Sequence, residues 1–143
     1  KITDLPFGTA VWGMNVKALR TIVKVKTIVD TEIWGYLIDQ PDLFNVHTIH
    51  AEPALTRPQY RLTLDYPEDY QMINYLYTHI PFTTTLGLPA VVSYLDAHPE
   101  VVAINAKCIQ LDLPDALKEK INTNYRENFQ RIKKIKEDTY ARP

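Results

Sequence analysis

Residues 61–70 read Arg-Leu-Thr-Leu-Asp-Tyr-Pro-Glu-Asp-Tyr, and their order decides how the fold is interpreted. Leu62 and Leu64 alternate with a polar residue, which predicts a short strand over 61–64. Asp65 follows directly, and Pro67 then begins a helix with two acids in its first turn. A carboxylate at the C-terminal end of a strand lies where α/β sheets collect their ligands. Asp65 is therefore the first candidate for a functional residue.

Helical and extended segments alternate on both sides of this stretch. Apolar residues recur at helical spacing over 16–25, 30–38, 67–80 and 88–97. Extended patterns predict strands over 9–14 and 44–49, and 101–104 is a short β-branched run. The longest periodic segment runs from 112 to 137 and predicts one amphipathic C-terminal helix. The sequence thus predicts an α/β fold in which helices are the majority.

The overall composition narrows the function classes. The chain has 143 residues and a mass of 16.5 kDa, enough for one modest core. Sixteen basic and 17 acidic residues give a net charge of −1, so no large field attracts nucleic acid or an anionic membrane surface. Cys108 is the single cysteine, and no apolar stretch approaches the roughly 20 residues that cross a bilayer. We expect a cytoplasmic protein whose partners are neither nucleic acid nor membrane.

Residues 61–70 also resemble the second acidic motif of the sugar cytidylyltransferases, the acylneuraminate and spore-coat-polysaccharide type CMP-sugar synthetases. In that family an Arg-x-Thr-x-Asp-x-Pro-Glu-Asp run supplies an aspartate ligand for the catalytic magnesium, and Asp65 holds the matching position. Three further segments resemble the family in the same order: Leu-Pro-Phe-Gly-Thr at 5–9, Thr-Glu-Ile-Trp-Gly at 31–35 with Pro-Asp-Leu-Phe at 41–44, and His-Pro-Glu-Val-Val-Ala-Ile-Asn at 98–105.

Other family features have no counterpart in the sequence: the opening strand, the nucleotide loop with its arginine and lysine, and the first magnesium aspartate. Because the chain also starts with Lys1 rather than Met, we expect it to be the C-terminal half of such an enzyme.

The resemblance implies a fold, a reaction and partners. The implied fold is the C-terminal half of a Rossmann-like nucleotide-diphospho-sugar transferase. Residues 1–111 would belong to the nucleotidyltransferase domain, and 112–143 would form the C-terminal amphipathic helix. The implied reaction transfers CMP from CTP to an acidic or amino sugar, with Mg²⁺ as cofactor. Subunit pairing is usual in the family, so a homodimer is expected. The parent is expected to be an enzyme, while activity of this fragment stays open.

Three residues are candidates for the site. The resemblance implies that Asp65 is the catalytic metal ligand, although Asp65 and Glu68 also form a D-x-x-E capping pattern that would explain an acid here. Magnesium usually takes one or two carboxylates together with substrate phosphates, so Asp65 would be half of a site. Glu32 occupies the family's position for a sugar-proximal acid. Arg61 could bind a carboxylate or phosphate of the substrate, or could be a salt-bridged surface residue.

Two departures from the family pattern leave the sugar unassigned. The family's common Glu-His-Val-Thr is Glu-Ile-Trp-Gly at 32–35, and Ala-Val-Trp at 10–12 stands where many members place an acid. His47 and His50 are three residues apart in a predicted strand, so they point to opposite faces and disfavour a shared zinc site. The alternative function is a non-catalytic oligomerisation or binding module derived from the same fold. A hydrolase has little support, because no G-x-S-x-G motif occurs.

Overall fold

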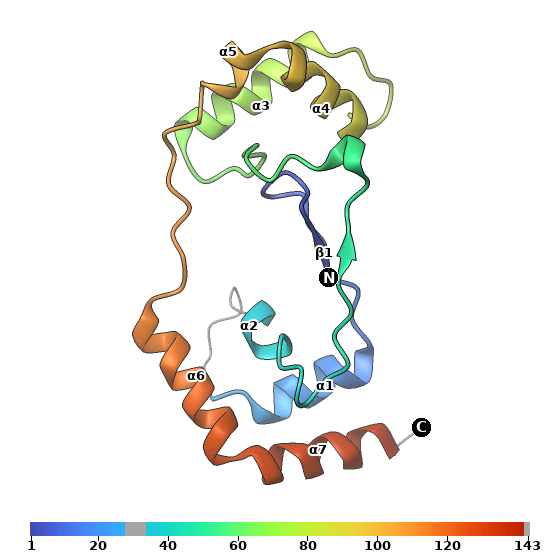
Figure 1. Cartoon of the computed structure of the whole chain (residues 1–143), viewed down its shortest axis with the longest axis vertical. Helices are drawn as coiled ribbons and strands as arrows, with labels where there is room; N and C mark the ends of the chain where they lie inside the picture. The colour runs from blue at the N-terminus through green and yellow to red at the C-terminus, as the bar shows by residue number, and fades with distance from the viewer. Residues whose placement is uncertain (28–33, 142–143) are drawn as a thin grey trace. The chain divides into compact units, whose positions relative to one another are not determined.

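The computed structural model describes residues 1–27 and 34–141 and is dominated by helices (Figure 1). The helices are α1 (Val16–Val25), α2 (Trp34–Ile38), η1 (Pro53–Leu55, a 3₁₀ turn), α3 (Pro67–His79), α4 (Leu88–Ala97), α5 (Pro99–Val102), α6 (Asp115–Glu127) and α7 (Phe129–Ala141). Two short strands, β1 (Ile2–Thr3) and β2 (Ile49–His50), pair in parallel. This architecture agrees with the predicted α/β class with helices in the majority.

The chain divides into two compact units. The first combines Lys1–Trp12 with Thr48–Gln110, and the second combines Gly13–His47 with Leu111–Pro143. Each unit is therefore built from two segments that are distant in the sequence. The division predicted at residue 111, between a transferase portion and a C-terminal helix, stays a prediction about the parent enzyme.

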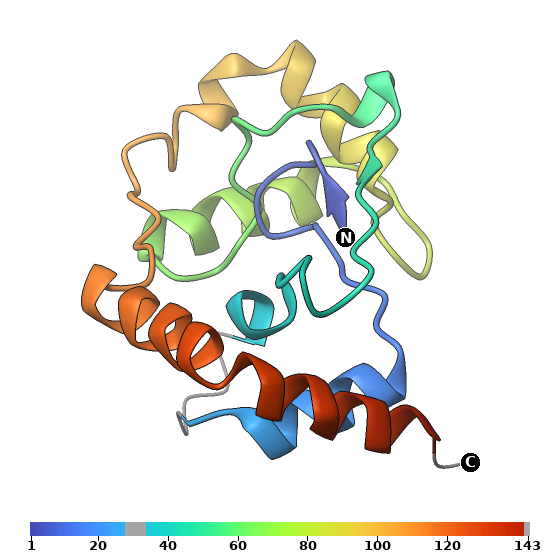
Figure 2. The same ribbon diagram turned by 60° about the horizontal axis from the view of Figure 1, so that its bottom comes forward.

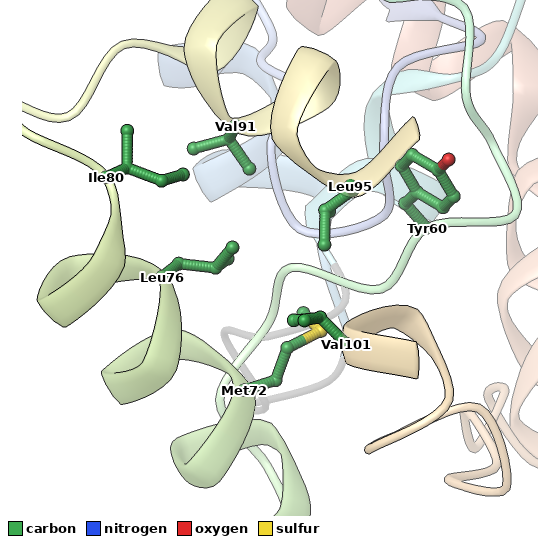
Figure 3. Close-up of a cluster of buried hydrophobic side chains, with 7 residues drawn as sticks. All are labelled: Tyr60, Met72, Leu76, Ile80, Val91, Leu95 and Val101. Carbon is green, nitrogen blue, oxygen red and sulfur yellow. The ribbon is translucent and has the colours of Figure 1, made fainter. Parts of the chain in front are cut away.

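The first unit has a core between α3, α4 and α5. Figure 3 shows the side chains of this core pointing toward one another from the three helices, from the end of α3 and from the segment that carries Tyr60. Its buried members are Tyr60, Met72, Leu76, Ile80, Val91, Leu95 and Val101. Pro67 and Pro89 stand in the first turns of α3 and α4, where a missing N–H costs no helix hydrogen bond. The core thus depends on the helical spacing that the sequence predicted for 67–80 and 88–97.

The second unit packs α1 against α7, which run side by side in both Figure 1 and Figure 2. Ile132 is completely buried, and Ile22 and Val25 are buried with it in this unit. The ammonium group of Lys24 donates to Thr139 Oγ1 at 2.8 Å, which links the two helices. Buried Tyr125 donates to the carbonyl oxygen of Leu37 at 2.6 Å, and burial raises the pKa of its phenol to about 12.

Most of the predicted strands are not strands. Residues 9–14 form no regular element, and of the strand predicted over 44–49 only Ile49 joins β2. Over 61–64 the pairing is reduced to one parallel bridge between Phe7 and Arg61. The β-branched run at 101–104 begins inside α5 and continues as a turn. A segment with strand-like residues forms a strand only where a neighbouring strand pairs with it by backbone hydrogen bonds. Within 1–27 and 34–141, β1 and β2 are the only strands paired in this way.

The predicted single C-terminal helix is two helices. Asn128 separates α6 from α7, with backbone angles of −108° and 15°. Its side-chain amide donates to the carbonyl oxygen of Asn124 at 3.1 Å, and its own carbonyl accepts from the amide of Ile132 at 2.9 Å. An asparagine that hydrogen-bonds nearby backbone competes with helical hydrogen bonding, so the helix ends and restarts here. The apolar spacing continues across the break, which is why the sequence pattern concealed it.

Candidate functional site

The site is built where residues 5–9 lie against residues 60–62. The amide of Phe7 donates to the carbonyl of Tyr60, and the amide of Leu62 donates to the carbonyl of Phe7, both at 2.7 Å. The next residue, Gly8, has a φ of 94°, and a Cβ there would lie 2.7 Å from the carbonyl oxygen of Leu62. Only glycine fits such a close approach with a left-handed backbone, so Gly8 permits this pairing.

The pairing places Arg61 in the interior of the first unit. Its guanidinium carbon lies 5.6 Å from the centre of the Phe7 ring and 5.3 Å from that of Tyr66. Nε donates to Asp69 Oδ1, Nη1 donates to Gln110 Oε1, and Nη2 donates to both Asp69 Oδ2 and Asp65 Oδ2. Each guanidinium nitrogen is engaged, so Arg61 organises the carboxylates around it.

Asp69 is the buried partner of Arg61 and the N3 residue of α3, whose N-cap is Tyr66. Its carboxylate accepts from the backbone amides of Asp65 and Tyr66, each at 3.0 Å, and its side chain is fully buried. Asp65 is therefore not the N-cap that the D-x-x-E pattern suggested; Asp69 instead reaches back from the first turn to the amides of Asp65 and Tyr66. The hydrogen bonds from Arg61, and after them those from the two amides and Asn105, hold the pKa of Asp69 well below its usual range.

Asn105 brings a third distant segment to the same point. Its side-chain amide donates to Asp69 Oδ1 at 2.8 Å and to the carbonyl oxygen of Arg61 at 3.0 Å. Residues 5–9, 61–70 and 98–105 therefore meet at one buried node, made of Arg61, Asp69 and Asn105. These are three of the segments that resemble the sugar cytidylyltransferases. Asp69 and Asn105 were missed as site residues, although both stand inside the motifs that were quoted.

Asp65 lies at the exposed edge of this node, with 51% of its side chain accessible. Its Oδ2 accepts from Arg61 Nη2 at 2.8 Å and from Thr63 Oγ1 at 3.3 Å. Its Oδ1 accepts no hydrogen bond from the residues that the structure describes. One oxygen is therefore oriented and the other is open, which is the arrangement of a carboxylate that can bind a cation through one oxygen.

The donor set near Asp65 supplies one metal-binding carboxylate. Among residues 1–27 and 34–141, no three His, Cys, Asp or Glu side chains are grouped so that they could hold a metal ion. Glu32 lies outside the described residues, as does the rest of the 31–33 part of the motif. The roles of Asp65, Arg61 and Glu32 thus stay predictions, with Asp65 the one whose surroundings leave it accessible.

A second arginine–carboxylate pair in the same unit offers a useful contrast. Arg57 donates to Asp96 through Nε at 2.8 Å and Nη2 at 2.7 Å, and the Tyr60 hydroxyl also donates to Asp96 at 2.7 Å. These bonds lower the pKa of Asp96 to about 2. Both Asp96 oxygens are occupied by protein donors, so this pair has a structural role.

The chain is a helix-rich α/β protein whose distinguishing feature is an exposed aspartate on a buried arginine node. No protein-family model matches it, and no solved structure matches it. Among curated proteins it is similar to the spore coat polysaccharide biosynthesis protein SpsF of Bacillus subtilis strain 168, with 26% identity over 102 residues. The match covers 69% of this chain and 42% of SpsF, so the chain spans less than half of that relative's length. Throughout the described ranges, every helix is too short or too polar to cross a membrane.

Proposed function

We propose that this chain is the C-terminal part of a nucleotidyltransferase of polysaccharide biosynthesis, with a Rossmann-like parent fold. The parent reaction is the transfer of CMP from CTP to an acidic or amino sugar. The observation that carries the proposal is Asp65, an exposed carboxylate with one open oxygen on the node where three family-like segments meet. The similarity to a spore coat polysaccharide biosynthesis protein supports the same class.

The chemistry of the donor set fits a role for Asp65 as one ligand of Mg²⁺, a hard cation that prefers carboxylate oxygens. When bound, the metal supplies neutralisation of the charge that builds on the phosphate oxygens. Arg61 holds Oδ2 and so orients the carboxylate, leaving Oδ1 toward solvent. Asp69 balances the charge of Arg61, so that Asp65 keeps its negative charge for a cation. The remaining ligands and the nucleotide loop are assigned to the rest of the parent.

The other predicted roles follow from the same proposal. Glu32 is proposed to contact the sugar. Arg61, which the sequence predicted to bind substrate, is proposed to act indirectly by orienting Asp65, because its nitrogens are already engaged with Asp65, Asp69 and Gln110. The parent is further proposed to be a cytoplasmic homodimer.

The decisive experiment replaces Asp65 in the intact parent enzyme. Asp65→Ala is expected to lower CMP-sugar formation by about a hundredfold or more, because losing a metal ligand removes several kcal/mol of transition-state stabilisation. Asp96→Asn is the matched control, since it alters another arginine-paired carboxylate of the same unit. Turnover should be kept in the control. Equal turnover in Asp65→Ala and the unmodified parent would remove Asp65 from the mechanism.

The alternative, a binding module without a reaction, is distinguished by nucleotide binding. CTP with Mg²⁺ should raise the melting temperature of the intact parent and leave that of the present chain nearly unchanged, because the proposed phosphate cradle belongs to the remainder. A parent that shows no thermal shift with CTP would favour the module.

A further inference from the structure

The first unit carries an apolar pocket that the proposed reaction does not use. The pocket has a volume of about 220 Å³ and lies against α3, the loop that precedes α4 and the first turns of α4. Leu76 and Val91 belong both to the pocket and to the core shown in Figure 3, so the core fixes part of the pocket wall. The apolar residues that line the pocket are Leu62, Ile73, Leu76, Leu86, Leu88 and Val91.

The chemistry of this lining favours an uncharged, apolar occupant. Thr9 also lines the pocket, but its hydroxyl group donates to the carbonyl oxygen of Pro6 at 2.7 Å. A carboxylate or ammonium group would meet no charged side chain among the described lining residues, so its loss of water would cost binding free energy. The apolar wall, in contrast, gains when an apolar group removes it from water. Apolar cavities of about 150 Å³ hold a benzene molecule, so this pocket has room for one aromatic ring.

The surface beside the pocket has exposed aromatic rings in a stretch of sequence without formal charge. Between Asp69 and Asp96 the sequence contains no Asp, Glu, Lys or Arg, although 23% of the whole chain is charged. In this stretch Tyr77, which lines the pocket, is 52% exposed and Phe82 is 43% exposed. Their rings pack edge to face with centroids 5.3 Å apart. The central parts of protein–protein interfaces are depleted of charged residues and enriched in aromatic ones, and this surface has the same composition.

We propose that the pocket is the docking site for another protein, which inserts one aromatic side chain from an uncharged segment. Binding energy in interfaces is concentrated in aromatic side chains that fill desolvated pockets, and the contacts around them exclude water. Tyr77 and Phe82 provide those surrounding contacts. An uncharged segment matches this surface, because a charge facing it would be desolvated without a counter-charge. An anionic membrane does not match it, because that attraction requires Lys or Arg beside the apolar residues. The inference uses neither Asp65 nor a bound metal.

The first test is an NMR titration of the isotope-labelled chain with N-acetyltryptophanamide, which carries an aromatic ring between two peptide groups and has no charge. Amide resonances in 73–77 and 86–91 are expected to shift and saturate together at millimolar ligand. The correspondingly blocked lysine and glutamate should bind at least about tenfold more weakly, because the pocket offers their charges no partner. Absence of saturable shifts at these residues, or equal binding of the charged compounds, overturns the proposal.

Matched variants connect the binding to the pocket. Tyr77→Ala removes the exposed wall and should weaken N-acetyltryptophanamide about tenfold or more. Leu86→Ala, a change in the loop before α4, should weaken it in the same direction. Tyr70→Ala is the control, because Tyr70 is 62% exposed on the same helix and lies outside the pocket lining. The control should bind as the unmodified chain does. Binding that is unchanged in both Tyr77→Ala and Leu86→Ala contradicts the assignment of the pocket.

A second measurement addresses the partner. A random peptide library displayed on phage is selected against the whole chain, and the selected peptides should share one Trp, Phe or Tyr flanked by uncharged residues. Their affinity should fall about tenfold for Tyr77→Ala and stay unchanged for Tyr70→Ala. Peptides selected for charge would overturn the proposal. Shifts of the same amides with increasing concentration of the chain alone would assign the pocket to a second copy instead. Failure of N-acetyltryptophanamide to reach the pocket in the intact parent would show that the parent fills it.

Discussion

Asp65 and Asp69 share one arginine but occupy opposite environments. Asp69 is fully buried and accepts from Arg61, Asn105 and two backbone amides, whereas half of Asp65 is exposed and one of its oxygens is open. A buried charge that loses its partner is strongly destabilising, while an exposed pair contributes little. We therefore expect Asp69 to stabilise the fold, whereas Asp65, four residues earlier, is available for the proposed chemistry.

Replacing each acid should reveal this difference. Asp69→Asn is expected to lower the free energy of unfolding by about 3 kcal/mol, because Arg61 would keep its burial and lose its main partner. Asp65→Ala should cost at most about 1 kcal/mol, as expected for a partly exposed pair. Urea denaturation followed by circular dichroism measures both. Similar losses for the two variants would mean that Asp65 is also part of the structural node.

Acid should weaken the fold through the same carboxylates. The pKa of Asp69 is lowered in the folded chain from its ordinary value of 3.8, and those of Asp96 and Asp112 are lowered to about 2. A lowered folded pKa contributes stability above the unfolded value, and this stability is lost as the pH falls toward the folded value. The melting temperature should therefore drop as the pH is lowered from about 5 to about 2.

The contribution of Asp69 to this acid response can be isolated by substitution. Asp69→Asn should start from a lower melting temperature at pH 7 and lose less on acidification, because asparagine does not titrate in this range. Asp96→Asn should still show the decrease in melting temperature on acidification that is due to Asp69, because its Arg61–Asp69 pair is unchanged. If the melting temperatures of Asp69→Asn and of the unmodified chain fell in parallel as the pH was lowered, Asp69 would not determine the loss of stability in acid.

At the scale of elements, one glycine permits the contact that assembles the node. Gly8 combines a φ of 94° with a close approach to the backbone of Leu62 and Thr63. The neighbouring bridge of Phe7 and Arg61 is the only pairing of residues 61–64 that the structure shows in the part of the chain it describes. The node thus depends on a single close backbone contact instead of a full strand.

Gly8→Ala should therefore destabilise the first unit by about 1–3 kcal/mol, the usual cost of a strained backbone position. Gly13→Ala is the matched control, because a Cβ at Gly13 meets no atom within 4 Å. The control should change stability by less than about 1 kcal/mol. Urea midpoints of the two variants give the comparison, and a Gly8→Ala protein as stable as the control would show that residues 7–9 relax without cost.

At the scale of the whole molecule, the chain carries two separate cores. Leu95 and Val101 are buried in the first unit, and Ile132 and Ile121 in the second. Each core is closed by segments far apart in sequence, so neither unit corresponds to a continuous half of the chain. Local opening can therefore differ between the units.

Matched core truncations test this organisation. Ile132→Ala and Leu95→Ala each remove a side chain that is at most 1% exposed, and each should cost about 2–5 kcal/mol in its own unit. Native-state hydrogen exchange should show that Ile132→Ala exposes amides of α1, α6 and α7, and that Leu95→Ala exposes those of α3 and α4. Equal loss of protection in all of these helices, for either variant, would show that the two cores open as one.

Sequence patterns predicted the helices well and the strands poorly. The helices over 16–25, 67–80 and 88–97 follow from spacing of apolar residues, a signal that each segment carries within itself. Extended structure depends on a partner, so residues 9–14 and 44–49 had the composition of strands without the neighbours to make a ladder. The helix break at Asn128 was hidden because the apolar spacing runs across it.

The sequence by itself determined the helix-rich α/β class and singled out Asp65, since periodicity and the motif at 61–70 are local properties. Only the tertiary structure decided that Asp69, rather than Asp65, is the buried partner of Arg61 and accepts from the N-cap amide of α3. It also decided that Asn105, 44 residues after Arg61, donates hydrogen bonds to Arg61 and Asp69. Burial and long-range hydrogen bonding are properties of the assembled chain, so the difference between two nearby acids appears only when distant segments meet.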